Sequence, residues 1–267
     1  MAWYEWGMQR ERSGIGAEFD KRAATYDASA MHRWQAHEAV RLAVPHPNTQ
    51  VLDVATGTGL AAREAAALTG EHGRVVGVDL SLGMLRVARR HSPGNCSYAV
   101  ADAHRLPFGD DRFDLIMCVA GLPYLDAEAA VREWARVARP GAAIVFTVPR
   151  AEGVSVNHLM SQAAQTEGID LPDLHAELGT THRLRELSSS LGLEAEDIQR
   201  IVWEEPEPLD DPAEIWQRGL NYGFAEPLKA AAPAARERAR RRFIKQAEGH
   251  HPRQDLFLAC FTLPTSA

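Results

Sequence analysis

Short apolar runs alternate with helical stretches between residues 50 and 148, and this alternation constrains the fold more than any other feature of the sequence. The runs are expected strands at 51–55, 75–78, 97–100, 113–119 and 142–148. The stretches between them are expected helices at 60–68, 82–91 and 127–138. Apolar strands joined by right-handed helical crossovers form a parallel sheet with helices on both faces. The sequence therefore predicts a doubly wound α/β fold.

The segments on either side of this region are organised differently. Apolar positions on one face predict a helix at 31–44 that ends before Pro45, and an arm with several aromatic residues and Ser13, Gly14 and Gly16 precedes it. After Pro149 the pattern predicts helices at 154–168, 183–191, 213–220 and 228–248 and strands at 198–203 and 256–263.

Charge and composition limit the class of partner. The chain has 267 residues, 45% of them hydrophobic and 24% charged, which is ordinary for a globular protein. Its net charge of −7 gives no broad attraction for a polyanion, so we expect no nucleic-acid partner. The dense basic run at 236–242 includes Glu237 and follows a helical pattern, which favours a solvated helix face.

The cysteines and the hydropathy pattern indicate the cellular compartment of the protein. Cys96, Cys118 and Cys260 are scattered without CxxC spacing, so we expect a reducing compartment and neither a disulfide framework nor a metal site. The first residues lack the apolar stretch of a secretory signal, and no apolar run approaches the ~18 residues of a membrane span. These features predict a cytoplasmic protein.

One glycine-rich turn carries the first chemical signal. In VLDVATGTGLAA, residues 51–62, Gly57, Gly59 and Ala62 satisfy the spacing G-x-G-x-x-[G/A] between an expected strand and helix. A tight turn without a ligand is the alternative interpretation. Asp79 ends the next strand about twenty residues further on, where a carboxylate binds ribose hydroxyls. Together they favour a nucleoside-containing ligand.

Two further acids indicate the charge of that ligand. Asp53 lies in the strand before the turn, which is unfavourable for a diphosphate, and Asp102 follows another strand. Each acid alone can be a helix cap or a surface residue. Three carboxylates at the carboxyl ends of successive strands favour a cationic ligand with ribose and adenine donors, and S-adenosylmethionine has these groups.

The ordered series of motifs resembles the class I S-adenosylmethionine-dependent methyltransferases, in particular the branch of the ubiquinone and menaquinone biosynthesis C-methyltransferases. The motifs are FDKRAATYD (19–27), VLDVATGTG (51–59), VVGVDLSLGML (75–85), ADAHRLPF (101–108), FDLIMCVAGLPYL (113–125) and RPGAAIVFTVP (139–149). The resemblance implies a seven-stranded sheet of order 3-2-1-4-5-7-6 whose last strand, 256–263, is antiparallel. It also suggests an N-terminal arm and helical lid over 1–48 and a Rossmann-like domain over 49–267, with a helical substrate cap inserted at about 151–192.

The resemblance also implies which residues bind S-adenosylmethionine. The methionine end would lie on the turn of Ala55, Thr56, Gly57 and Gly59, near Asp53 and Val119 and under Tyr26. Asp79 would bind the ribose, and the adenine would contact Leu80, Met84, Asp102 and Ala103. Ala55 replaces a glycine of the family pattern, and we expect tighter packing there without loss of binding.

The acceptor side departs further from the family. Many relatives have a pair of histidines after the fourth strand, where this chain has Pro123-Tyr124. Tyr124 and His158 are the catalytic candidates, with a pocket wall and an exposed helix face as their respective alternative roles. Weaker candidates are His32, His37 and His104. Expected acceptor contacts are Trp34, Met31 and Leu159, with Trp3 and Trp6 as further candidates.

These observations predict methyl transfer to a small, largely apolar molecule, preferably to oxygen and less so to carbon or nitrogen. The setting would be bacterial quinone or specialised-metabolite biosynthesis, by analogy with the family. A homodimer is one expectation for assembly. The alternatives are methylation of RNA or protein, a cofactor-binding protein or cyclase without methyl transfer, and, more distantly, a nicotinamide-dependent dehydrogenase.

Overall fold

The computed structural model describes residues 12–173, 175–221 and 223–265. They form two compact units. The first holds residues 12–148, 181–199 and 258–265, and the second holds 149–180 and 200–257. The predicted division into a lid, a main domain and a cap stays a prediction.

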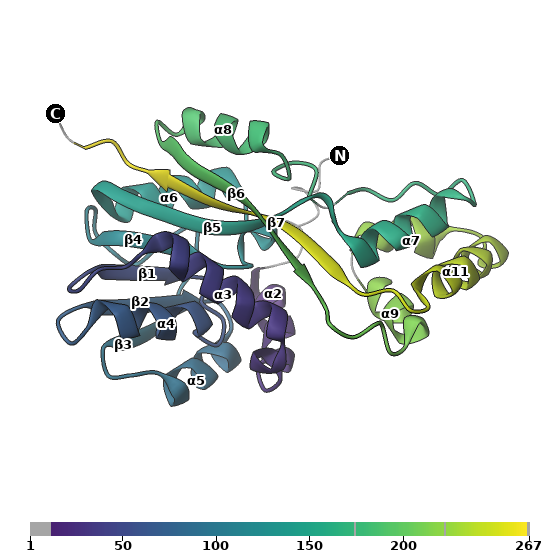
Figure 1. Cartoon of the computed structure of the whole chain (residues 1–267), viewed down its shortest axis with the longest axis horizontal. Coiled ribbons are helices and arrows are strands. Elements are labelled where there is room, and N and C mark those ends of the chain that lie inside the picture. The colour runs from purple at the N-terminus through teal and green to yellow at the C-terminus, as the bar shows by residue number, and fades with distance from the viewer. Residues whose placement is uncertain (1–11, 174, 222, 266–267) are drawn as a thin grey trace. The chain divides into compact units, whose positions relative to one another are not determined.

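A seven-stranded sheet runs through the described part of the chain in the order β3-β2-β1-β4-β5-β7-β6 (Figure 1). Its strands are β1 (Gln50–Val54), β2 (Arg74–Asp79), β3 (Cys96–Val100), β4 (Phe113–Cys118), β5 (Ala138–Val154), β6 (Glu194–Glu204) and β7 (Arg253–Thr262). Neighbours among β1 to β5 pair in parallel, whereas β7 is antiparallel. The predicted fold class and strand order are confirmed.

The helices lie close to the ranges that the sequence predicts, with two differences. They are α2 (Arg12–Arg22), α3 (Ala30–Ala43), α4 (Leu60–Thr69), α5 (Leu82–His91), α6 (Ala127–Val137), α7 (Ser155–Gln165), α8 (Thr181–Ser190), α9 (Pro212–Gly219), α10 (Glu226–Ala230) and α11 (Pro233–Ala247), with short 3-10 turns η1 (Tyr26–Ala28), η2 (Leu122–Tyr124) and η3 (Gly223–Ala225). The single helix expected at 228–248 is divided into α10 and α11. Pro233 is the cause, because a residue before proline avoids helical geometry, and Ala232 has a ψ of 135°.

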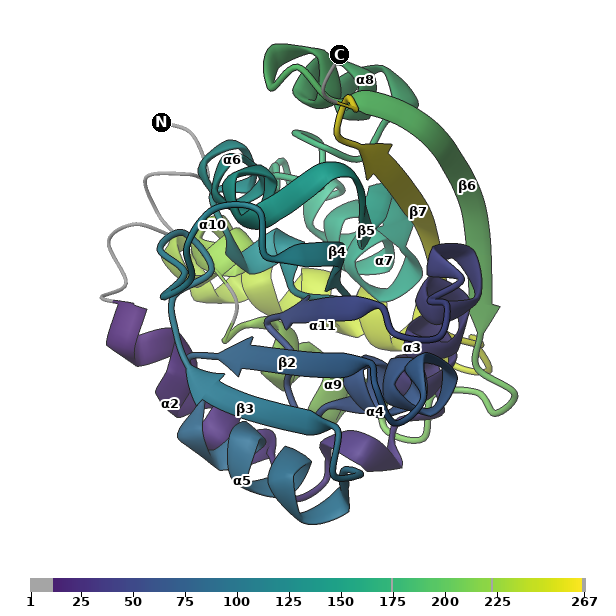
Figure 2. The same ribbon diagram turned by 90° about the vertical axis from the view of Figure 1, so that its left-hand side faces the viewer.

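The second difference is α2, which replaces the irregular arm expected around Gly14 and Gly16. This helix packs beside α5 (Figure 2). A Cβ at Gly16 would lie 3.0 Å from the carbonyl oxygen of Leu80, so the glycine permits the close approach of the two segments. Trp3 and Trp6 lie outside the described residues.

Apolar packing fixes the carboxyl ends of the central strands. Val51, Leu52 and Val54 of β1 are fully buried, and four alanines of α4 form the face that packs near them. Small side chains let the helix approach the strands closely, which positions the turn between β1 and α4. Ser81 is the N-cap of α5, because its hydroxyl accepts a hydrogen bond from the Met84 amide at 3.0 Å. Among the described residues, every helix is too short or too polar to span a bilayer.

Candidate functional site

The turn after β1 is built from residues in the left-handed region. Ala55, Gly57 and Gly59 have φ values of 53°, 56° and 80°. A Cβ at Gly59 would lie 2.7 Å from the Tyr98 hydroxyl, so glycine is required there for space as well as for conformation. An alanine in the left-handed region costs about 1 kcal/mol or more in backbone strain. The Ala55 methyl lies against Gly121, because a Cβ added to Gly121 would be only 2.7 Å from it. The close packing expected at Ala55 is present.

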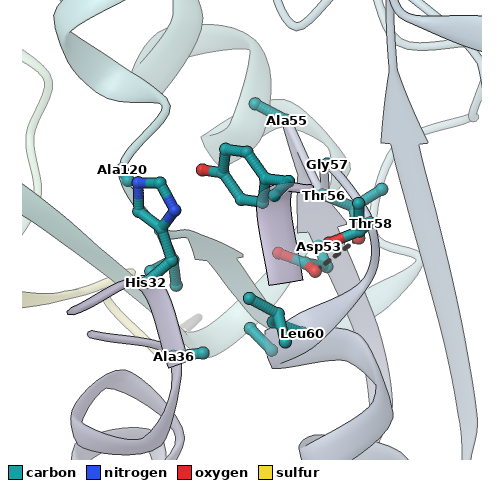
Figure 3. A pocket seen from close by; sticks show the side chains of 12 residues that line it. His32, Ala36, Asp53, Ala55, Thr56, Gly57, Thr58, Leu60 and Ala120 are labelled. Carbon is teal, nitrogen blue, oxygen red and sulfur yellow. Dashed lines mark hydrogen bonds between the residues drawn. The ribbon is translucent and has the colours of Figure 1, made fainter. Parts of the chain in front are cut away.

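A pocket opens over this turn (Figure 3). It is lined by Tyr26, His32, Ala36, Asp53, Ala55, Thr56, Gly57, Thr58, Leu60, Ala61, Val119 and Ala120, all in the first unit. Half of the predicted cofactor residues line it: Tyr26, Asp53, Ala55, Thr56, Gly57 and Val119. The structure therefore brings together the residues expected at the methionine end, apart from Gly59, which is not part of the lining.

Asp53 is the buried acid of the pocket. Its side chain is 1% exposed and accepts a 2.6 Å hydrogen bond from the Thr56 hydroxyl. Burial raises the pKa of Asp53 to about 7, against the lowering effect of the Thr56 hydrogen bond. A cation bound nearby would favour the ionised form, so this carboxyl group is suited to a positively charged ligand.

Asp79 connects the pocket to the next strand end. One of its carboxylate oxygens accepts from the Gly57 amide and the other from the Ser81 amide, each at 2.8 Å. Burial raises the pKa of Asp79, although both amide bonds oppose the shift. Each carboxylate oxygen has a second lone pair, so these contacts leave acceptor capacity for ribose hydroxyls.

The predicted adenine residues lie at the same edge of the sheet but do not line the pocket. Met84 is 1% exposed and packs with Ala23 and Val87 beneath Phe19 and Tyr26. Leu80 is half-buried, and the carbonyl of Ala103 accepts a 3.1 Å hydrogen bond from the Trp134 indole. Their contacts with adenine stay predictions.

Tyr26 and His32 form one wall of the pocket. Their rings stack in parallel at 4.1 Å, and burial raises the pKa of Tyr26. Asp27 fixes this segment to the start of α4 by accepting hydrogen bonds from the Thr58 hydroxyl and, at 2.9 Å, from Arg63. The segment expected to cover the methionine end is thus tied to the turn it would cover.

His32 is a pocket residue that the sequence ranked among the weaker candidates. Its imidazole is among the side chains that line the pocket (Figure 3). Burial and then the charge of Arg22 lower the pKa of His32 to about 4, so the ring is neutral at pH 7. Its Nδ1 is buried, and no described residue gives it a hydrogen-bond partner. The sequence signal that could have placed His32 in the pocket is its position six residues after Tyr26, at the start of a helix.

The candidates for the acceptor side lie outside the pocket lining. Tyr124 is 47% exposed in η2, with its ring edge-on to Phe19 at 5.2 Å. Met31 and Trp34 lie half-buried on α3. His158 and Leu159 lie on α7 in the second unit, where His158 forms a hydrogen bond with Gln162 at 2.8 Å. The catalytic and acceptor roles of all five residues stay predictions.

Comparison with known proteins agrees with this geometry. The methyltransferase domain family matches residues 51–141. The ubiquinone/menaquinone biosynthesis C-methyltransferase UbiE of Shewanella sp. (strain ANA-3) is 35% identical over 153 residues, which is 52% of this chain and 61% of the relative. UbiE of Pseudomonas putida (strain F1) is 34% identical over 164 residues, 56% of this chain and 62% of the relative. The chain thus spans about three-fifths of the length of these relatives.

Solved structures with this fold are more distant in sequence. A putative methyltransferase from Bacillus halodurans C-125 is 20% identical, with a TM-score of 0.59 over 86% of this chain and 99% of that one. The [4+2]-cyclase SpnF is 17% identical, with a TM-score of 0.62 over 96% and 97% of the two chains. Residues 51–141 thus match the methyltransferase domain family, and the resemblance of this chain to the class I S-adenosylmethionine-dependent methyltransferases is confirmed.

Proposed function

We propose that this protein transfers a methyl group from S-adenosylmethionine to a small, largely apolar acceptor. The composition of the pocket carries the proposal: among the residues that the structure describes, its lining includes the buried acid Asp53 and neither lysine nor arginine. Such a lining favours a ligand with positive charge and offers no cation to a diphosphate. The sulfonium and ammonium groups of S-adenosylmethionine meet that requirement. Tyr26 lies over Gly57, with its Cε1 3.9 Å from the place where a Cβ would stand.

The division of roles among the cofactor residues follows the family resemblance and the geometry of the strand ends. Asp53 and the turn of Ala55, Thr56, Gly57 and Gly59 would hold the methionine end, with Val119 below it and Tyr26 above it. Asp79 would accept hydrogen bonds from the ribose hydroxyls. Leu80, Met84, Asp102 and Ala103 would surround the adenine.

The chemistry required of the chain is alignment and exclusion of water. When bound, S-adenosylmethionine supplies an electrophilic methyl group, and a nucleophile placed in line with the sulfur–carbon bond needs little further activation. The stacked pair of Tyr26 and His32 would shield the methionine end from solvent. Tyr124 and His158 are the proposed proton acceptors, and Trp34, Met31 and Leu159 are the proposed contacts of the acceptor.

Oxygen is the acceptor atom that we propose, in a molecule of the quinone or specialised-metabolite type. The names of the relatives favour carbon of a quinone precursor as the second candidate. Methylation of RNA would need a basic surface, which the net charge of −7 disfavours. Cofactor binding without methyl transfer to any of a panel of acceptors would instead favour a non-methylating protein on the same fold.

Binding of S-adenosylhomocysteine, measured by calorimetry, tests the proposal. Asp79→Ala should weaken binding by at least about 10-fold, because it removes a charged acceptor of the ribose hydroxyls. Asp110→Ala is the matched control, since this carboxylate is 71% exposed and pairs with Arg136. Its affinity should stay within about 2-fold of the unsubstituted protein. Absence of binding, or preferential binding of NAD, would reject the proposed cofactor.

A further inference from the structure

Asp102, the acid expected to recognise adenine, belongs to the same sheet edge as the pocket. Val100 is in register with Asp79, and the Ala101 amide donates to the Asp79 carbonyl at 3.2 Å. Asp79 in turn accepts from Gly57 in the turn under the pocket. A continuous set of contacts therefore leads from the pocket to the loop that carries Asp102.

His104 contacts the carboxylate of Asp102 in two ways. The imidazole Nδ1 lies 2.7 Å from the carboxylate Oδ1, and the His104 backbone amide donates to the same oxygen at 3.0 Å. The side chains of both residues are largely buried, with 16% of His104 and 19% of Asp102 exposed. The pair is therefore better shielded from solvent than a surface ion pair.

The partner of the other ring nitrogen fixes the protonation of His104. Nε2 lies 3.0 Å from the backbone amide of Asp126, which can only donate a hydrogen bond. Nε2 must then be the acceptor, so the proton of the neutral ring is on Nδ1 and points to Asp102. Asp126 is itself the N-cap of α6, where its side chain accepts from the Ala129 amide at 3.0 Å. The ring is thus held between a helix cap and the carboxylate.

We propose that His104 is a positioning residue for base recognition: it fixes the plane of the Asp102 carboxylate so that this acid accepts a hydrogen bond from the exocyclic amine of adenine. The inference rests on the proposed function. A carboxylate on a loop rotates freely about its last torsion, and ordering it on binding costs affinity. The contacts with His104 pre-order it, so the selectivity for an amino-bearing purine depends on a residue that need not touch the base.

A purely structural role for His104 makes a different prediction. If the residue only holds the loop together, its loss should weaken every ligand of the site equally. If it orients Asp102, its loss should weaken only ligands whose base carries an amine at this position. Hypoxanthine differs from adenine there, because a carbonyl oxygen replaces the amine and two acceptors then face each other.

The experiment compares the calorimetric affinities of S-adenosylhomocysteine and S-inosylhomocysteine. The unsubstituted protein should prefer the adenosyl ligand by at least about 10-fold. His104→Phe removes both nitrogens and should weaken the adenosyl ligand by about 5- to 20-fold and the inosyl ligand by less than about 2-fold. His104→Asn keeps an N–H near the position of Nδ1 and should restore most of the selectivity.

Two controls separate positioning from general damage. In His91→Asn the lost contact is a 3.0 Å bond to the Val87 carbonyl at the end of α5, so affinity and selectivity should not change. In the background of Asp102→Asn, His104→Phe should have no further effect on selectivity, because the group that it positions is already altered. Side-chain ¹⁵N spectra of the unsubstituted protein should show the proton of His104 on Nδ1.

Each outcome supports or overturns the inference. An unchanged ratio of the two affinities in His104→Phe overturns it, as does an equal loss for both ligands or a proton on Nε2. If His104→Phe does not fold, the tautomer and the affinity ratio of His104→Asn decide the question. If the unsubstituted protein binds neither ligand, the proposed function itself fails. Binding of S-adenosylhomocysteine that depends on Asp79 but not on His104 would reject this inference alone.

Discussion

Three carboxyl groups of this chain show how the surroundings of an aspartate decide its charge. At Asp53 the cost of desolvation outweighs hydrogen bonds from the Thr56 hydroxyl and the Ala62 backbone, so burial raises its pKa to about 7. Asp79 is also buried, but two backbone amides partly offset that cost. At Asp255 burial likewise raises the pKa, but hydrogen bonds from Arg200 and Arg150 outweigh it, and the pKa is lowered. Among these three carboxyl groups, the one whose pKa is lowered is the one with arginine partners.

The raised pKa of Asp53 predicts a specific dependence of stability on pH. An unfolded aspartate ionises near pH 3.8, whereas folded Asp53 keeps its proton up to about pH 7. The folded chain therefore binds the extra proton in this window, and the free energy of unfolding should fall as the pH rises from about 4 to 7. At about 1.4 kcal/mol per unit, the fall that is due to Asp53 is at most ~4 kcal/mol.

Asp53→Asn isolates this contribution, because the amide keeps the shape of the side chain without titrating. Urea unfolding at pH 4.5 and at pH 8 should show the variant gaining stability relative to the unsubstituted protein at the higher pH. A stability difference that is the same at both pH values would contradict the assigned pKa. Measurements are made without ligand, since a bound cation would favour the ionised form of Asp53.

At the scale of elements, α2 depends on tertiary contacts rather than on its own sequence. It contains two glycines and has no acidic residue in its first turn, so its intrinsic helix propensity is low. Asp20 compensates by joining it to α5: one carboxylate oxygen accepts from the Ser81 hydroxyl at 2.5 Å and from the Gly83 amide at 2.7 Å. The same two bonds, the Ser81 hydroxyl first, lower the pKa of Asp20.

Asp20→Ala should therefore loosen α2 and leave the sheet intact. We expect amide hydrogen exchange over residues 14–22 to accelerate by about 10-fold and the free energy of unfolding to fall by ~1 kcal/mol, as for the loss of a helix cap. Lys21→Ala is the control, because this exposed side chain lies on the same helix. Equal exchange rates in the two variants would show that Asp20 does not anchor the helix.

At the scale of the whole molecule, the described chain divides between a unit that holds the pocket and a unit with a charged network of its own. Strands β5, β6 and β7 contribute residues to both units. In the second unit, Asp255 is 7% exposed and lies 2.7 Å from Arg150 and 2.6 Å from Arg200. The arginines are about one-third and one-half exposed, so solvent screens part of the attraction.

Removal of Asp255 should destabilise the second unit far more than the pocket. Asp255→Ala leaves Arg150, Arg200 and the more distant Arg253 without their shared carboxylate, at an expected cost of ~2 kcal/mol, less than for a fully buried pair. Limited proteolysis should then cut within 200–257 earlier than in the unsubstituted protein, while the affinity for S-adenosylhomocysteine stays within about 2-fold. Asp210→Ala, at an exposed position of the same unit, should change neither. A large loss of ligand affinity in Asp255→Ala would contradict this independence.

The order of the elements and the methionine end of the site follow from the sequence by itself. Strand and helix periodicity are local properties, and the glycine spacing of 57 and 59 specifies a tight turn wherever it occurs. Acids that end successive parallel strands must meet at one sheet edge, so Asp53 and Asp79 could be placed together before any coordinates were known. These inferences need only the chain and the geometry of a parallel sheet.

Burial and hydrogen-bond partners were decided by the tertiary structure, because they depend on residues distant in the chain. The sequence does not show which residues His32 and His104 contact. In the structure the first stacks on Tyr26 in a pocket wall, and the second contacts Asp102 and the Asp126 amide. The helix α2 likewise forms because Asp20 meets α5, some sixty residues away. Through-space contacts of this kind leave no periodic trace in the sequence.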